Sequence, residues 1–373
     1  MDSILGLNVN LSLSLLPILL LATPGPVTPL HKHLALTGTG ITDAGGAGLA
    51  SYLSDCLSVL TLCLGLQTAL DPSTLNGGEY PACAALTTGY LFRVENAATV
   101  AFLQQITRTG SLTRLEVRST SPSPSPSSSS SGGWFGFRGR LVSSVACLPT
   151  VALLLVLLLL LSKPRLLSPS STGAEVSVSA AVLLSASLLL LSRLFATISF
   201  CARTRRPSWH GAPEPGVAGD LLVLLSEDRW ARVTGLVDDL KAVTSGRWLA
   251  RRPAHPLVMD CLDWMAGMMV WVAVVVLGGA SDQEKGALVG AVLVGHWILM
   301  FENARAGELV MNGRTVRVAK RKKYARRLEL AEELIKEVGR SDFAVRLGMI
   351  NPEQVKDLGK GDGDETRNEV VTM

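Results

Sequence analysis

Residues 257–279, LVMDCLDWMAGMMVWVAVVVLGG, form the stretch on which the prediction of the fold depends. A helix needs about 20 apolar residues to cross a hydrocarbon layer of ~30 Å, because each residue adds only ~1.5 Å of length. The stretch has this length, and its only charged residues, Asp260 and Asp263, lie near its beginning. It therefore predicts a membrane-spanning helix.

Four other stretches share this composition, while most charged residues lie between the stretches. They are 48–70, 141–162, 176–200 and 286–303. Together with 257–279 they predict an all-α fold, a polytopic transmembrane helix bundle over residues 48–303. The N-terminal segment, residues 1–47, contains one more uncharged stretch at 4–23, whose apolar centre is short for a span. The sequence leaves open whether the chain has five spans or six.

The distribution of basic residues predicts the orientation of the bundle. Thirty of the 35 Lys and Arg residues lie between 70 and 141, between 200 and 257, or after 303. Loops rich in Lys and Arg stay on the cytoplasmic side of a membrane. These alternate segments are therefore predicted to be cytoplasmic, and so is the C-terminus.

The segment between the first two spans contains STSPSPSPSSSSSGG at residues 119–133. This stretch has no apolar side chain with which to form a core. Such a composition is typical of a disordered linker.

Residues 226–246 have apolar side chains at helical spacing. Ser226 is a suitable N-cap, Glu227 and Asp228 favour the first turn, and Gly246 is a natural end. The pattern predicts a cytoplasmic amphipathic helix that lies on the inner membrane surface or against the bundle. The apolar residues are Trp230, Val233, Leu236, Val237, Leu240 and Val243.

Residues 304–373 are predicted to form a basic cytoplasmic tail. Asn312 and Gly313 stand between β-branched residues, which indicates a two-residue β-hairpin over 308–318. Residues 320–340 are predicted to be helical, with an apolar face between Tyr324 and Val338.

Residues 314–327 of this tail include eight basic residues and no acidic one. Basic residues beside a cytoplasmic membrane surface each gain about 1 kcal/mol from anionic lipid. We therefore predict contact with anionic lipid head groups, while a solvated surface without a ligand and a protein partner bound through 324–338 stay open. A nucleic-acid partner is not expected for a membrane-anchored chain. The cluster is Arg314, Arg317, Lys320, Arg321, Lys322, Lys323, Arg326 and Arg327.

Ionisable residues at membrane depth indicate a second candidate site. Arg193, Asp263 and His296 each lie about seven residues from the predicted inner boundary of their span, roughly 10 Å deep. The spans of Asp263 and His296 are joined by a very short connection, which predicts antiparallel neighbours. The three residues form a candidate intramembrane polar layer, and pairing between helices is the alternative to a proton- or ion-linked site.

No motif in the sequence indicates an enzyme. P-loop, GxSxG, HExxH and protein-kinase signatures are missing, and the six cysteines contain no CxxC pair. We therefore predict no catalytic residue, no cofactor and no metal site.

Two stretches carry a resemblance to known proteins. They are GDLLVLLSEDRWARVTGLVDDLKAVTSGRWL at 219–249 and PLHKHLALTGTG at 29–40. With them the chain resembles uncharacterised multi-pass integral membrane proteins of filamentous fungi. The resemblance implies a membrane protein and supplies neither an activity nor a catalytic residue.

These observations predict a non-enzymatic, multi-pass integral membrane protein whose cytoplasmic surface contacts anionic lipid or a protein partner. The alternative is a transporter or channel that uses the Arg193, Asp263 and His296 layer.

Overall fold

A mixed sheet of seven strands lies at the centre of the structure, so the predicted all-α fold is wrong. The computed structural model describes residues 15–21, 32–33, 35–36, 72–119, 179–204, 211–248 and 256–353. The strand order is β2-β1-β4-β5-β3-β7-β6, with β3 and β5 parallel and the other neighbours antiparallel. The strands are β1 (Ala82–Ala85), β2 (Leu91–Arg93), β3 (Ser111–Ser119), β4 (Ala218–Leu225), β5 (Arg229–Leu236), β6 (Glu308–Met311) and β7 (Arg314–Lys323).

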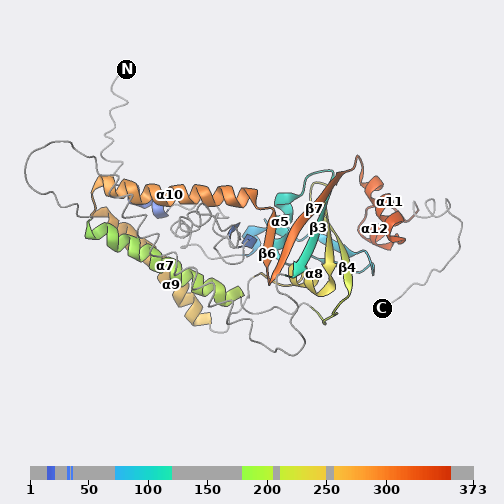
Figure 1. Cartoon of the computed structure of the whole chain (residues 1–373), viewed down its shortest axis with the longest axis horizontal. Helices are drawn as coiled ribbons and strands as arrows, with labels where there is room; N and C mark the ends of the chain where they lie inside the picture. The colour runs from blue at the N-terminus through green and yellow to red at the C-terminus, as the bar shows by residue number, and fades with distance from the viewer. Residues whose placement is uncertain are drawn as a thin grey trace, which may run out of the picture.

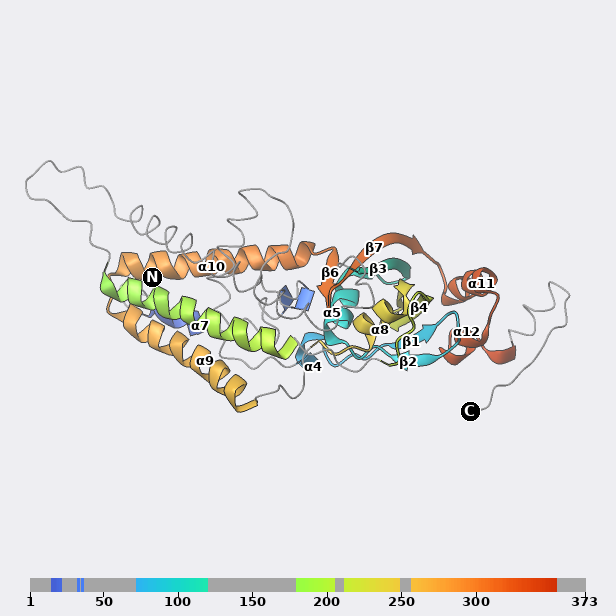
Figure 2. The ribbon, with the colours of Figure 1, turned by 60° about the horizontal axis from the view of Figure 1, so that its bottom comes forward.

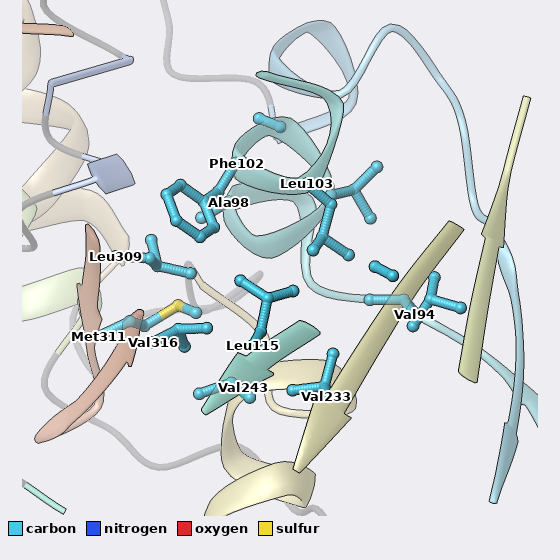
Figure 3. Close-up of a cluster of buried hydrophobic side chains, with 14 of the residues drawn as sticks. Val94, Ala98, Phe102, Leu103, Leu115, Val233, Val243, Leu309, Met311 and Val316 are labelled. Atoms are coloured by element: carbon cyan, nitrogen blue, oxygen red, sulfur yellow. The ribbon is translucent and has the colours of Figure 1, made fainter. Parts of the chain in front are cut away.

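One face of the sheet is covered by α5 (Ala97–Ile106) and α8 (Val237–Thr244). Successive side chains of a strand point to opposite faces, so alternate residues of β3 and β5 reach this layer. Figure 3 shows Phe102 and Leu103 of α5 above Leu115 of β3, with Leu309 and Val316 of the β6–β7 hairpin closing the same core. The short helix α4 (Pro72–Leu75) lies beside α5.

The opposite face of the sheet is covered by α11 (Arg327–Val338) and α12 (Asp342–Arg346). Leu112 of β3 and Leu222 of β4 point to this side and are fully buried beneath Leu334 and Phe343. The sheet is therefore buried on both faces, and the strands with these five helices form the α/β domain.

Three long helices form an arm beside the domain (Figure 1). They are α7 (Ala180–Thr204), α9 (Pro256–Gly278) and α10 (Asp282–Arg305), with the short 3-10 helix η1 (Leu16–Leu21) packed against α9 and α10. Helix α7 runs antiparallel to α9, since Ser185 donates to the carbonyl of Ala273 at 3.0 Å and Ser192 donates to that of Ala266 at 2.6 Å. Small residues allow such close helix approach.

The end of the arm far from the domain is held by polar contacts. Ser281 caps α10 in a capping box with Glu284. The carboxylate of Glu284 also accepts the backbone N–H of Ser179 at 2.9 Å, just before α7 begins. One buried carboxylate thus fixes the starts of two helices, and from this end α9 and α10 diverge toward the domain (Figure 2).

The predicted amphipathic helix at 226–246 is wrong for most of its length. Residues up to Leu225 and from Arg229 form the β4–β5 hairpin, and helix begins only at Val237. Glu227 and Asp228 turn the chain with φ of 61° and 52°. The apolar residues of β5 lie on both faces of the sheet, with Ala231 and Val233 in one core and Trp230 in the other. Pairing with two neighbouring strands therefore determines the extended conformation here, although the apolar residues also have helical spacing.

Other predictions for local structure have mixed outcomes. The hairpin with Asn312 and Gly313 at its turn is confirmed, whereas the predicted helix 320–340 begins only at Arg327 because β7 extends to Lys323. Helices α7, α9 and α10 cover 180–200, 257–278 and 286–303 of the predicted spans. Of the helices that the structure describes, α9 alone is long and apolar enough to cross a membrane by itself. The stretches 48–70 and 141–162, residues 120–133 of the linker and most of 4–23 lie outside the described residues.

Candidate interaction surfaces

The predicted intramembrane layer is described only at Asp263. Its carboxylate pairs with Arg203 in the last turn of α7, and the same guanidinium lies 3.6 Å from Asp260. The side chains of Arg193 and His296 lie outside the described part of the chain, so the layer stays a prediction. Arg203 was missed because the antiparallel pairing of α7 with α9, which brings it to Asp263, cannot be deduced from the sequence.

The outer surface of the arm is rich in large apolar side chains. Val275 of α9 keeps 75% of its surface exposed and Trp297 of α10 keeps 76%. Contiguous exposed apolar patches of this kind mark interaction sites or membrane contact. The exposed set on the three long helices is Leu183, Leu184, Leu191, Leu257, Val258, Trp264, Met265, Met268, Trp271, Val272, Val275, Leu293, Trp297, Met300 and Phe301.

The basic cluster predicted at 314–327 divides into two groups. Four residues form ion pairs within the domain: Arg314 with Asp239, Arg317 with Glu308, Lys322 with Glu333, and Arg327 with Asp228. The other four are exposed and make no ion pair in the part of the chain that the structure describes. They are Lys320, Arg321, Lys323 and Arg326. Half of the predicted cluster is therefore available to a ligand.

Three of these free residues lie on an open strand edge. Strand β6 pairs with β7 only from Arg314 to Arg317, so residues 320–323, which we call the basic edge, pair with β3 alone. The backbone N–H of Tyr324 donates to the carbonyl of Gly110 at 3.0 Å, toward β3. Because alternate residues of an antiparallel strand direct their backbone groups to opposite sides, those of Arg321 and Lys323 face away from β3.

The basic edge lies away from the arm. Figures 1 and 2 show β7 leading from the side of α10 toward α11, at the end of the domain opposite the arm. Electrostatic attraction in water decays over about 8–10 Å at physiological salt. A membrane around the arm would thus be a distant partner for this edge, which weakens the lipid interpretation.

Helix α11 is fastened beside the basic edge by an ion-pair network. Arg232 of β5 donates to both carboxylate oxygens of Asp220 in β4, and at 2.7 Å to Glu337 in α11. Burial acts to lower the pKa of Arg232, but the hydrogen bonds and charges of the two carboxylates outweigh it and raise the pKa. The hydrogen bond from Arg232 lowers the pKa of Glu337 in turn. The network thus keeps Arg232 and Glu337 charged at neutral pH.

A second ion pair fastens the same helix. Lys322 bonds to Glu333, and its ammonium lies 5.0 Å from the centroid of the Tyr324 ring. Leu330 and Leu334 of α11 are fully buried on the sheet. The apolar face of 324–338, considered above for a protein partner, is therefore covered by the chain's own sheet.

The network of Asp220, Arg232 and Glu337 was not predicted from the sequence. Asp220 and Arg232 are diagonal neighbours on the same face of the β4–β5 hairpin, because Leu222 pairs with Arg232. If residues 218–236 had been interpreted as two strands of a hairpin, alternation along the strands would have placed Asp220 and Arg232 on the same face. The contact with Glu337 has no signal in the sequence, since it depends on where α11 packs.

The described residues give no indication of a metal site, and one of their free cysteines, Cys83, is buried. Within them, no three His, Cys, Asp or Glu side chains are placed to hold a metal ion. Burial raises the pKa of the Cys83 thiol, which favours its unreactive protonated form.

Comparison with protein-family models, curated proteins and solved structures gives no match, so the resemblance to fungal membrane proteins stays a prediction.

Proposed function

We propose that this chain is a non-enzymatic integral membrane protein that holds its α/β domain at the cytoplasmic face of a bilayer. The observation that carries the proposal is the exposed apolar surface of the arm. In the most apolar 18-residue stretch of α9, only 33% is buried, whereas a helix in the core of a soluble protein would be mostly buried. Lipid supplies the apolar surroundings that the chain itself does not provide.

The distribution of charge along the arm supports this proposal. Residues 264–280 and 286–301 contain no Asp, Glu, Lys or Arg, which corresponds to about 25 Å of helix in each case. Asp282, Glu284 and Lys285 lie at the outer end of the arm. Arg203 and Asp263 pair at the end nearer the domain. Charges at both ends of an apolar section are typical of helices that cross a hydrocarbon layer.

The composition of the sheet agrees with the predicted orientation. The sheet contains strands from 82–119, 218–236 and 308–323. These ranges fall in the three segments that hold the excess of basic residues. Segments that form one sheet lie on one side of any membrane crossed by the helices between them, and the positive-inside rule makes that side cytoplasmic.

The proposal is tested by membrane extraction combined with glycosylation mapping in microsomes. A flexible loop carrying an Asn-x-Thr acceptor is inserted either between Gly279 and Ala280, at the outer end of the arm, or between Asn312 and Gly313, in the domain. Both are made with Asn10→Gln, which removes the chain's own Asn-Leu-Ser acceptor. We expect glycosylation of the first insertion alone, and a chain that stays in the membrane fraction in alkaline carbonate.

Release of the chain by carbonate would overturn the membrane anchor, and glycosylation of the insertion between Asn312 and Gly313 would overturn the orientation. The transporter or channel alternative gains no support from the described residues, since Asp263 is already engaged by Arg203. It stays a prediction from the sequence.

A further inference from the structure

The basic edge combines unpaired backbone groups with unpaired positive charge. Arg321 and Lys323 direct their N–H and C=O groups away from β3, and no described strand lies on that side. A strand edge of this kind can accept one further strand from another chain. Strand β6 pairs with β7 on this same side, so an added strand would continue the line that β6 begins.

The positive charge of the basic edge determines which kind of strand can pair with it. Lys320, Arg321, Lys323 and Arg326 are exposed and unpaired among the described residues, and no Asp or Glu occurs between residues 314 and 328. A second copy of the same strand would bring like charges opposite each other, which is destabilising. An acidic strand would instead gain hydrogen bonds and opposite-charge pairs together.

We propose that the basic edge of β7 binds an acidic, extended peptide segment of a partner protein as an added β-strand. The backbone groups of Arg321 and Lys323 form the hydrogen bonds, and side chains on both faces of the strand contact the acidic residues. Lys322 is held by Glu333, and Tyr324 is bonded to Gly110, so the neighbouring backbone is already ordered. This inference goes beyond the membrane anchor and does not depend on it.

The test uses the full chain in detergent micelles and a fluorescein-labelled peptide of ten alternating Glu and Thr residues. Fluorescence anisotropy measures binding at about 50 and 300 mM salt, and attraction between charges predicts weaker binding at the higher salt. The matched probe has the same sequence in alternating L and D configuration, which keeps the charge but cannot form a regular strand. We expect the all-L peptide to bind and the mixed peptide to bind at least about tenfold more weakly.

Two variants of one residue separate the backbone contribution from the charge. Arg321→Gln and Arg321→Pro lose the same charge, but only the proline also removes the N–H that faces the open side. We expect Arg321→Gln to weaken binding modestly and Arg321→Pro to weaken it about tenfold further, the effect of one or two lost hydrogen bonds. Thermal unfolding of both variants shows whether β7 stays folded.

Three results would overturn the proposal. They are equal binding of the all-L and mixed peptides, equal affinity of the two folded Arg321 variants, and binding to phosphatidylserine vesicles with none to the peptide. The comparison of the two peptides needs no variant, so it decides the matter even if Arg321→Pro unfolds. Failure of this test leaves the membrane anchor unaffected, since carbonate extraction tests that separately.

Discussion

The α/β domain buries its large apolar side chains, whereas the arm leaves many of its own exposed. In the domain, Phe102, Leu115 and Leu222 are fully buried, and the surface carries ion pairs. In the arm, residues as large as Trp271 and Trp297 are exposed, while Ser185 and Ser192 are buried between helices. The contrast agrees with the proposed function, in which the domain folds against water and the arm folds against lipid.

The largest effect that this comparison predicts comes from removing one aromatic ring in each region. Phe102→Ala deletes a fully buried ring from the domain core and should cost about 3–5 kcal/mol of unfolding free energy. Phe301→Ala removes a ring that is 55% exposed on α10 and contacts Arg305, and should cost less than about 1 kcal/mol. Denaturant unfolding in lipid nanodiscs measures both. Equal costs would remove the proposed difference between the regions.

The next effect comes from placing the same charge on each surface. Val275→Arg on α9 should cost about 2.5–3.5 kcal/mol if the exposed valine faces lipid. Val217→Arg, at a domain residue that is 46% exposed, should change stability by less than about 0.5 kcal/mol. The membrane-inserted fraction after synthesis with microsomes measures the first, and thermal unfolding measures both. A harmless Val275→Arg would indicate that the arm is in water.

A smaller effect tests whether the domain depends on charges in water. Glu337→Gln should destabilise the docking of α11 by about 1–1.5 kcal/mol at pH 7, because it weakens the contact with Arg232 in a partly solvated site. The pKa of Glu337 is lowered in the folded state, so its contribution is complete above the unfolded pKa, about 4.3, and is lost as pH falls through the folded pKa.

The measurement is the difference in melting temperature between the wild type and the variant at several pH values from 7 to 3. We expect the difference to shrink as the pH falls below about 4.3. Glu332→Gln on the exposed side of the same helix is the matched control, and it should have little effect at any pH. A difference between wild type and Glu337→Gln that does not change with pH would contradict the assignment.

The smallest effect compares one glycine from each region. Gly339 ends α11 with φ of 73°, a conformation that costs a residue with a side chain about 1 kcal/mol, so Gly339→Ala should destabilise by that amount. Gly278 at the end of α9 has open space where a Cβ would stand and no positive φ, so Gly278→Ala should be neutral or slightly stabilising. Thermal unfolding of the two variants measures this difference, and a stabilising Gly339→Ala would contradict it.

The sequence predicted the arm better than the domain for a physical reason. Helices α7, α9 and α10 are long apolar segments whose identity depends on local composition, and all three lie near their predicted ranges. Strand β3, in contrast, pairs with β5 and β7, more than 100 and about 200 residues further along the chain. No local pattern encodes such pairing, and so the sheet was not foreseen.

The candidate sites show the same limit. The basic residues from Lys320 to Arg326 were found because they are adjacent in sequence, but their position on an open strand edge follows only from the pairing of β7. The contact of Arg203 with Asp263 depends on how α7 packs on α9. Local composition therefore identified the charged residues of the candidate sites, and long-range packing determined which of them are in contact.

The interleaving of sheet and arm has a consequence for how a ribosome produces this chain. Strand β3 ends at Ser119, and its neighbour β7 begins at Arg314. Translation proceeds at about 5–20 residues per second, so roughly 10–40 s pass between the synthesis of β3 and that of β7. The helices of the arm are synthesised during this interval. The half-built domain exposes the apolar side chains of β3 during this interval, so we expect newly made chains to need chaperone protection and truncated ones to be degraded.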